Sequence, residues 1–229
     1  MIPKRIHYCW FGGAPLPSKA KKCIASWKKF CPDYEIVRWD ESNFDLQQND
    51  YVQWCYAHQK WAFLSDYARL AIVAEQGGVY LDTDVELVKS LDHLLTQPAF
   101  YSFENNESIN TGQGFGALAH HETVEAMKAC YEDLDPETVR PCPYYNTLAL
   151  VQLGLEPNGQ MQTVAGAAIL PADYMNPYDD PTGRLNKTEN TVSIHWYSKS
   201  WISPGLRLRS KLTRPLHRLF GKDCFRRKG

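Results

Sequence analysis

The sequence lacks an apolar run of the roughly 18 residues that a membrane-spanning helix requires. Its N-terminus also lacks the apolar segment of a secretory signal peptide, so cytoplasmic residence is the expectation. The 7 cysteines are odd in number and have no paired ligand spacing, which argues against a disulfide framework or a zinc site and predicts reduced thiols. Neither sign of charge dominates, because 25 basic residues face 26 acidic ones. These absences leave a globular chain of 229 residues, enough for one large domain or two small ones.

The near-zero net charge conceals an uneven distribution. Residues 206–229 contain nine Lys or Arg and one acid, a net of +8, so the total of −1 leaves −9 on residues 1–205. A basic amphipathic helix is predicted here, kinked at Pro215. Two interpretations stay open: the helix lies on an anionic lipid surface, or it docks on the core with a solvated basic face. Nucleic-acid binding is disfavoured because the rest of the chain is acidic. The apolar residues at helical spacing are Leu208, Leu212, Leu216, Leu219 and Phe220.

Alternating apolar runs and helical periodicities predict an α/β fold with a parallel sheet. No internal repeat or linker precedes the basic segment, so we expect one domain over residues 1–204 and a basic tail over 205–229. The predicted strands cover residues 5–11, 34–39, 79–81, 85–88, 98–103, 115–118 and 192–197. The predicted helices cover residues 17–30, 61–76, 121–134 and 145–153, and residues 40–50 are expected to form a polar loop.

The helix over residues 61–76 has the clearest pattern in the chain. It is expected to end at Gly77, whose freedom to adopt positive φ suits a helix C-terminus. Its predicted buried stripe consists of Phe63, Tyr67, Leu70, Ala71 and Ala74.

Two aspartates, Asp82 and Asp84, follow the strand that leaves this helix. Strand alternation predicts that both carboxylates point to one side, with Thr83 opposite. Hard cations such as Mg²⁺ and Mn²⁺ prefer oxygen ligands. An Asp-X-Asp triplet alone is more often a solvated turn. The preceding helix stop and apolar strand favour a cation site that holds a diphosphate.

Polar side chains on the same helix and at the end of the first strand extend this hypothesis. Asp66 and Arg69 form an i, i+3 pair, in which Arg suits a diphosphate and Asp suits sugar hydroxyls. The alternative is an intrahelical salt bridge. Trp10, followed by Phe11 and two glycines, suits stacking on a nucleobase. The alternative is a core Trp before an ordinary turn.

A second group of polar residues lies near the end of the expected domain, between Ile194 and Trp201. His195 would complete the metal shell of Asp82 and Asp84, although a single His on an apolar strand is more often a core residue. Ser200 and Trp201 have the hydroxyl and indole N–H groups that donate hydrogen bonds to a diphosphate.

Several segments together resemble glycosyltransferase family 32, a group with an Asp-X-Asp motif. This family includes fungal initiating mannosyltransferases and bacterial polysaccharide transferases. The resemblance covers roughly the first 120 residues and lies in residues 2–13, 62–70, 76–84 and 110–117. Residues 195–201 also resemble the C-terminal segment of clostridial toxin glucosyltransferases, in which a Ser and a Trp hold the diphosphate. The last 25 or so residues resemble no known segment.

The resemblance implies a GT-A fold with a single Rossmann-like mixed sheet flanked by helices. It also implies a UDP- or GDP-sugar donor, Mn²⁺ or Mg²⁺, and retention of anomeric configuration. Front-face displacement is the working mechanism, because no carboxylate in the motifs is an evident nucleophile. Glu104 and Asn110 are placed near the sugar or the acceptor. In this resemblance, Trp10 would stack on the base, and Asp66 and Arg69 would bind the donor sugar. Asp82 would contact the ribose and the metal, and Asp84 and His195 would ligate the metal. Ser200 and Trp201 would bind the β-phosphate.

The acceptor is expected to be a glycan, most simply a lipid-linked oligosaccharide at the inner face of a bacterial plasma membrane. The basic tail would then make peripheral contact with anionic lipid. This hypothesis points to capsule, exopolysaccharide or O-antigen synthesis. A protein acceptor is disfavoured because no segment resembles the translocation segments of toxins.

Two other functions compete with this interpretation. A nucleotidyltransferase acting on sugar phosphates also uses a metal and a nucleotide. It requires a glycine-rich basic loop, to which residues 12–17 are a poor match. A non-catalytic sugar-binding module has little need for Asp82, Asp84 and Arg69 together.

Overall fold

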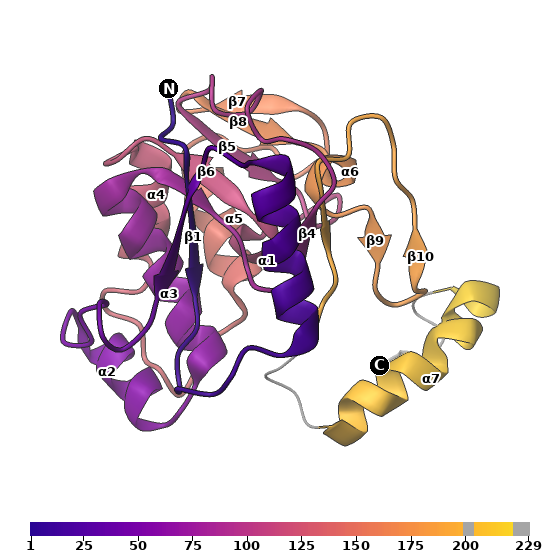
Figure 1. The fold of residues 1–229 in the computed structure, drawn as a ribbon, viewed down its shortest axis with the longest axis horizontal. Helices are drawn as coiled ribbons and strands as arrows, with labels where there is room; N and C mark the ends of the chain where they lie inside the picture. Colours follow the sequence, from indigo (N-terminus) through magenta and orange to yellow (C-terminus); the bar gives the residue numbers. More distant parts are fainter. Residues whose placement is uncertain (199–203, 222–229) are drawn as a thin grey trace.

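A seven-stranded mixed sheet forms the centre of the computed structural model, which describes residues 1–198 and 204–221 (Figure 1). The strand order is β2-β1-β3-β6-β5-β8-β7. β1 pairs in parallel with β2 and β3, and β5 with β8, whereas the other neighbours are antiparallel. The mixed sheet is therefore confirmed, and the wholly parallel sheet expected from element order is wrong. The strands are β1 (Arg5–Cys9), β2 (Glu35–Trp39), β3 (Gly78–Tyr80), β5 (Ala99–Ser102), β6 (Phe115–Ala117), β7 (Gln162–Val164) and β8 (Ala167–Leu170).

Helices cover both faces of this sheet. Helix α1 lies on one face, and α3, α4 and α5 lie on the other (Figure 1). Side chains of β1 and β3 alternate between the two buried layers: Ile6 and Val79 face the α1 side, while Cys9 and Tyr80 face the α3 side. The helices are α1 (Ser18–Phe30), α2 (Asp50–Ala57), α3 (Trp61–Gln76), α4 (Glu122–Ala129), α5 (Cys142–Gln152) and α6 (Ala172–Met175), with a 3₁₀ turn η1 (Thr111–Gln113).

Helix α3 has the predicted boundaries. It ends at Gly77, which has φ of 64° and donates its backbone N–H to the Val73 carbonyl. Of the predicted stripe, Tyr67, Leu70 and Ala74 are buried, whereas Phe63 and Ala71 are half-buried. The buried surface extends to other residues because α2 and α4 pack against the helix as well as the sheet. The additional buried residues are Leu64, Ala68, Arg69, Ile72 and Val73.

Several short elements were not expected. Helix α2 follows the predicted polar loop, and the Asn49 side chain caps it by accepting the Val52 N–H. The strands predicted over residues 85–88 and 192–197 are present as β4 (Val85–Leu87) and β11 (Ser193–His195), but they lie outside the central sheet and pair antiparallel with each other. A small hairpin, β9 (Tyr178–Asp179) and β10 (Arg184–Leu185), projects beside them. The two-residue strands of this hairpin are too short to leave a periodic signal in the sequence.

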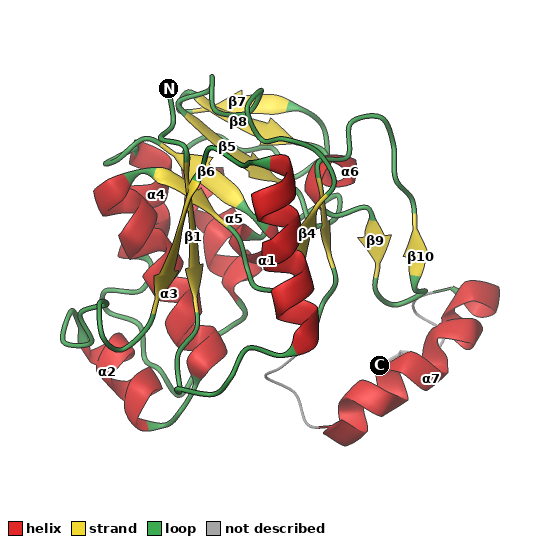
Figure 2. Ribbon diagram, in the orientation of Figure 1, coloured by secondary structure: helices red, strands yellow, loops and turns green. Residues whose placement is uncertain are grey.

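Helix α7 (Pro204–Phe220) packs beside the β9–β10 hairpin at the edge of the molecule (Figure 2). Arg214 donates to the Asp180 carboxylate at 2.9 Å, and Arg218 donates to the Thr182 and Gly183 carbonyls. The helix therefore contacts the body through two basic residues. Its leucines are exposed, which contradicts the interpretation of an apolar face docked on the core. Of the helices in the described residues, none combines the length and apolarity of a membrane span.

Candidate active site

Asp82 and Asp84 lie in a turn between β3 and β4, where the Val85 N–H donates to the Asp82 carbonyl at 3.0 Å. The expectation that strand alternation orients them is wrong, because β3 ends at Tyr80. Their carboxylates nevertheless converge with His195: one ligand atom from each residue lies within 4.8 Å of the other two. The turn, and not the pleat, brings the two acids together.

Helix α1 and strand β11 hold this turn in place. The Trp27 indole N–H donates to the Val85 carbonyl at 2.7 Å, and the Ser26 hydroxyl accepts the Leu87 N–H at 2.9 Å. On the other side of β4, His195 of β11 pairs with Val85, so the imidazole comes next to Asp84. Residues more than 100 positions apart in sequence are thus fixed at one site by a two-stranded ladder.

The Asp84 carboxylate is held from two directions. His195 Nε2 lies 3.4 Å from Asp84 Oδ1, and the Ser198 N–H donates to Oδ2 at 2.6 Å. Burial opposes the charged carboxylate, but the imidazole and Ser198 together hold its pKa below the ordinary value. Burial likewise opposes a charged imidazole, yet Asp84 raises the pKa of His195. The two groups behave as an ion pair, and His195 is 7% exposed.

Arg69 joins helix α3 to the same turn. Its Nη2 lies 2.9 Å from Asp66 Oδ1 and 3.2 Å from Asp82 Oδ1, and the side chain is buried. Tyr80 donates its hydroxyl to Asp82 Oδ1 at 2.9 Å. Burial raises the pKa of Asp66 to about 6, against the opposing effect of Arg69. The predicted helix pair exists, but it is buried and shared with Asp82, unlike an exposed intrahelical salt bridge.

A loop after β5 closes the site from the sheet side. Asn110 donates to Glu104 Oε1 at 3.0 Å and accepts the Gly112 N–H at 2.7 Å. A Cβ at Gly112 would lie 2.6 Å from Asp82 Oδ2. Tyr197 also donates to Glu104 Oε1, at 3.0 Å. Glu104 and Asn110 were predicted near the site, whereas Gly112 and Tyr197 were not singled out, because only the tertiary fold brings them there.

Trp10 directly follows β1 and is half-buried, and its backbone N–H donates to the Trp39 carbonyl at the end of β2. Its indole N–H donates to the Ala14 carbonyl within the following loop. Gly12 lies against Trp61 at the start of α3, where a Cβ would be 2.8 Å from the indole. The stacking role of Trp10 stays a prediction. Ser200 and Trp201 lie outside the described residues.

The chemistry of the three converging residues fits a divalent cation. Two carboxylates and an imidazole are the donor types that Mn²⁺ and Mg²⁺ sites combine with water and phosphate. The raised pKa of His195 and lowered pKa of Asp84 mean that a cation would replace a proton held between them. Within residues 1–198 and 204–221, Asp82, Asp84 and His195 form the one group of three His, Cys, Asp or Glu side chains whose ligand atoms lie close enough together to bind a single metal ion.

Comparisons with known proteins agree with this geometry. Residues 17–101 match the family model described as a glycosyltransferase sugar-binding region containing a DXD motif. The chain is 35% identical over 136 residues to inositol phosphoceramide mannosyltransferase 3 of Schizosaccharomyces pombe, covering 56% of this chain and 36% of that protein. The chain therefore spans about a third of the length of this relative.

Two solved structures show the same fold. A glycosyltransferase involved in glycosylation of the major capsid of PBCV-1 superposes with a TM-score of 0.52 and 12% identity, covering 90% of this chain and 98% of the other. The PaToxG glycosyltransferase superposes with a TM-score of 0.51 and 19% identity, covering 66% of this chain and 69% of the other. The fold is thus of the GT-A type, as the resemblance implied. Over residues 17–101 the chain is thus similar to the glycosyltransferases whose sugar-binding region contains a DXD motif.

Proposed function

We propose that this chain transfers a hexose from a nucleotide-diphosphate sugar to a glycan, with retention of anomeric configuration. The observation that carries the proposal is the position of Asp82. Its carboxylate contacts Arg69 and Tyr80 and also belongs to the Asp82–Asp84–His195 cluster. A diphosphate sugar needs such an arrangement, because its sugar and its phosphates are recognised by different groups a few ångströms apart. The similarity of residues 17–101 to the sugar-binding region of DXD-motif glycosyltransferases supports this function over a nucleotidyltransferase or a non-catalytic sugar-binding module.

The role proposed for each site residue follows from the groups that it contacts. Asp82, Asp84 and His195 would hold Mn²⁺ or Mg²⁺, which supplies positive charge to stabilise the leaving diphosphate. Arg69, fixed between two carboxylates, contributes preorganised positive charge to the same region. Asp66 is proposed to accept hydrogen bonds from sugar hydroxyls.

The remaining donor contacts come from the ends of the site. Trp10 is proposed to stack on the base of a UDP- or GDP-sugar. Ser200 and Trp201 are proposed to donate to the β-phosphate. Front-face displacement remains the working mechanism: the acceptor hydroxyl oxygen bonds to the anomeric carbon on the face from which the diphosphate departs, the bond between that carbon and the diphosphate breaks, and the hydroxyl proton passes to the departing diphosphate. The motif carboxylates are already engaged with Arg69 and His195, so a covalent nucleophile is not assigned.

Turnover of sugar nucleotides tests this proposal directly. A panel of UDP- and GDP-sugars is incubated with the full chain and Mn²⁺, and release of the nucleoside diphosphate is measured. We expect one donor to be hydrolysed slowly without acceptor, and Asp84→Ala to lower this rate at least about 100-fold. The exposed Asp33→Ala, which loses only a surface pair with Lys4, serves as the control. Full turnover by Asp84→Ala would show that the metal assignment is wrong.

We also propose that the acceptor is carried by a lipid, as in capsule, exopolysaccharide or O-antigen synthesis, and that the chain works at the inner face of the plasma membrane. The name of the fission-yeast relative, inositol phosphoceramide mannosyltransferase, specifies a lipid acceptor for that protein and supports a lipid-borne acceptor here. Two features of the molecule support the proposed membrane contact.

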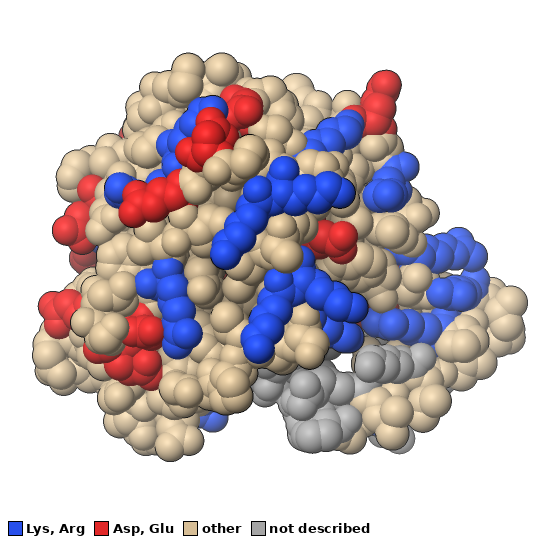
Figure 3. All heavy atoms as spheres, in the orientation of Figure 1, with Lys and Arg blue, Asp and Glu red and all other residues tan. Residues whose placement is uncertain are grey.

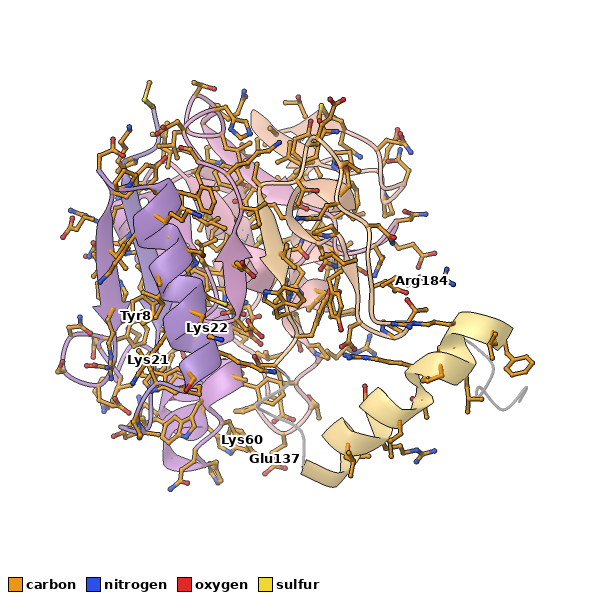
Figure 4. The ribbon with its side chains drawn as sticks, turned by 45° about the vertical axis from the view of Figure 1, so that its right-hand side comes forward. Tyr8, Lys21, Lys22, Lys60, Glu137 and Arg184 are labelled. Carbon is orange, nitrogen blue, oxygen red and sulfur yellow. The ribbon has the colours of Figure 1, made fainter. Side chains whose placement is uncertain are left out.

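The first feature is charge. Helix α1 has five lysines and no acid, and blue side chains gather over α1 and between the hairpin and α7 in Figure 3, while red ones lie mainly elsewhere. Figure 4 shows Lys21 and Lys22 on α1, and Arg184 on β10 beside α7. All three side chains belong to exposed residues. Each Lys or Arg near an anionic surface contributes about 1 kcal/mol of attraction.

The second feature is the exposed apolar surface of α7. Because Arg214 and Arg218 hold the helix to the hairpin, its leucines point away from the body. Leu212 is 68% exposed and Leu219 is 75% exposed. Apolar side chains on one face of a basic helix are the composition of helices that lie in the interface of anionic membranes. The full set of exposed apolar residues is Leu206, Leu208, Leu212, Leu216, Leu219 and Phe220.

A further inference from the structure

The second ring nitrogen of His195 poses a structural problem. Histidines that ligate metals usually donate their other N–H to a carboxylate or carbonyl, which fixes the orientation of the ring. Here Nε2 faces Asp84, and Nδ1 is buried without a hydrogen-bond partner among residues 1–198 and 204–221. In the part of the chain that the structure describes, a different contact must orient this imidazole.

That contact is the ring of Tyr197. The two ring centroids lie 4.1 Å apart with an interplanar angle of 30°, so the rings overlap in a tilted stack. Tyr197 is two residues from His195 in sequence. In a continuing β-strand, residues i and i+2 share one face, but their rings are too far apart for a 4.1 Å stack. The chain must turn sharply after β11 to bring the two rings together.

The backbone of Tyr197 makes this turn. Its φ is 47°, in the left-handed region that bulky residues rarely adopt. Such strain persists only where surrounding contacts hold the residue in place, and it concentrates at functional sites. The same turn points the Ser198 N–H at Asp84 Oδ2. The strained residue therefore lies between two groups that contact the same carboxylate.

Two hydrogen bonds fix the far end of the Tyr197 ring. Its hydroxyl donates to Glu104 Oε1 at 3.0 Å and accepts from the Asn176 side-chain amide at 2.7 Å. The same Asn176 amide also donates to the Glu104 carbonyl at 2.8 Å. Glu104 belongs to the loop after β5, and Asn176 follows α6, which itself contacts β11, so the ring hydroxyl is tied to two further segments of the fold.

We propose that Tyr197 is a positioning residue that holds the His195 imidazole toward Asp82 and Asp84 by ring stacking, in place of a hydrogen bond to Nδ1. The inference rests on the proposed cation site. It assigns no contact between Tyr197 and the substrate. Its consequence is that cation affinity depends on the Tyr197 ring and, to a smaller extent, on the hydroxyl that anchors the ring.

Manganese binding without a sugar nucleotide tests this inference. Full-length protein is titrated with Mn²⁺, and free Mn²⁺ is measured from its electron paramagnetic resonance signal. We expect Tyr197→Leu to weaken Mn²⁺ binding about 10- to 100-fold, the range found when the residues that support a metal ligand are removed. Tyr197→Phe keeps the ring and loses its anchor, so its loss should be measurable but smaller.

The matched control is Tyr101→Phe. It removes a buried tyrosine hydroxyl that is hydrogen-bonded to Thr123, 2.8 Å away, and belongs to the core. We expect it to lower the unfolding temperature while Mn²⁺ affinity stays unchanged, which separates positioning from general stability. Asp84→Ala separates the two proposals: unchanged Mn²⁺ affinity in that variant would overturn the cation site itself.

The inference about Tyr197 is overturned if Asp84→Ala loses Mn²⁺ binding while Tyr197→Leu binds like the unmodified chain. Should Tyr197→Leu fail to fold, Tyr197→Phe decides the question alone. Wild-type Mn²⁺ affinity in Tyr197→Phe would then show that the anchored ring does not position His195.

Discussion

Gly112 illustrates how closely the backbone approaches the acidic groups of the site. A Cβ at this position would lie 2.6 Å from Asp82 Oδ2 and 2.9 Å from Arg69 Nη1. Both distances are below ordinary contact, and both atoms belong to a buried ion pair with little freedom to move. The absence of a side chain at Gly112 is therefore a condition for the Asp82–Arg69 contact.

We predict that Gly112→Ala lowers sugar-nucleotide turnover at least about 10-fold, because a misplacement near 1 Å is enough to cost that much or more. Steady-state release of nucleoside diphosphate measures the effect. Gly116→Ala is the matched control, since its Cβ would meet the Phe100 ring, 2.5 Å away in the core. That variant should lose stability and keep the turnover of its folded fraction. Equal turnover in Gly112→Ala and the unmodified chain would contradict the prediction.

Single site residues were predictable where the residue type and its neighbours in sequence indicate the chemistry. Asp82, Asp84 and His195 were selected as metal ligands because carboxylates and imidazole suit cations, and the structure brings them within 4.8 Å. Their arrangement by a turn was not predictable, because a triplet after a strand looks the same whether the strand continues or ends. Gly112 and Tyr197 were missed because their roles depend on contacts across the fold, and neither a glycine nor a tyrosine signals such a contact.

At the scale of elements, the fully buried His7 connects three segments. On β1, it accepts the Trp39 indole N–H of β2 at Nδ1, 3.1 Å away, so its proton is on Nε2, 2.9 Å from the Gly77 carbonyl at the end of α3. The bond from Trp39 requires the neutral ring, because a protonated Nδ1 cannot accept, whereas Nε2–H can donate to the Gly77 carbonyl in either state. Burial lowers the pKa of His7 from 6.5 to about 4.

We predict that this histidine makes the fold sensitive to acid. The unfolded chain takes up the proton near pH 6.5 and the folded chain only near pH 4. The neutral His7 ring therefore stabilises the folded state fully above pH 6.5. This stabilisation is lost as the pH falls toward 4, and it amounts in total to on the order of 3 kcal/mol of unfolding free energy. Urea unfolding at pH 7.5, 6, 5 and 4 measures it. His7→Gln should lose less free energy of unfolding over this range, and the exposed His58→Gln should follow the unmodified chain. Parallel pH profiles for His7→Gln and the unmodified chain would refute the assignment.

The elements that the sequence predicted well are those with long periodic patterns. Helices α1 and α3 differ from their predicted ranges by one residue or none, and β1 to β3 were each located. Strand direction was not predictable from element order, because β6 inserts between β3 and β5 and runs antiparallel to both. The β9–β10 hairpin consists of two-residue strands, and its structural role is to hold α7 through the contact between Asp180 and Arg214.

For the whole molecule, the orientation of α7 decides what the basic tail can contact. The sequence predicted the amphipathic helix but left open which face meets the body. In the structure, the basic face of α7 meets the body: Arg214 pairs with the buried Asp180, and Arg218 donates to two carbonyls of the hairpin. A basic residue at these contacts leaves the leucines of α7 exposed to solvent.

We predict that the chain binds vesicles of anionic phospholipid and that α7 supplies the apolar part of this binding. Replacing Leu212 and Leu219 by Ser removes two side chains that are 68% and 75% exposed. Burying each leucine in the membrane interface is worth about 1.5–3 kcal/mol, so the double variant should lose at least about 100-fold in vesicle affinity. Flotation with vesicles containing phosphatidylserine measures the bound fraction.

The control for this prediction is Leu148→Ser, at a leucine that is 40% exposed on α5, which lies across the sheet from α1. This variant should float like the unmodified chain. Binding should also fall steeply with salt, because the lysines of α1 contribute through a field that is screened within about 8 Å at physiological ionic strength. Neutral vesicles should bind less protein than anionic ones for the same reason. Equal flotation of the double leucine variant and the unmodified chain would mean that α7 does not enter the lipid, and the exposed leucines would then need another partner.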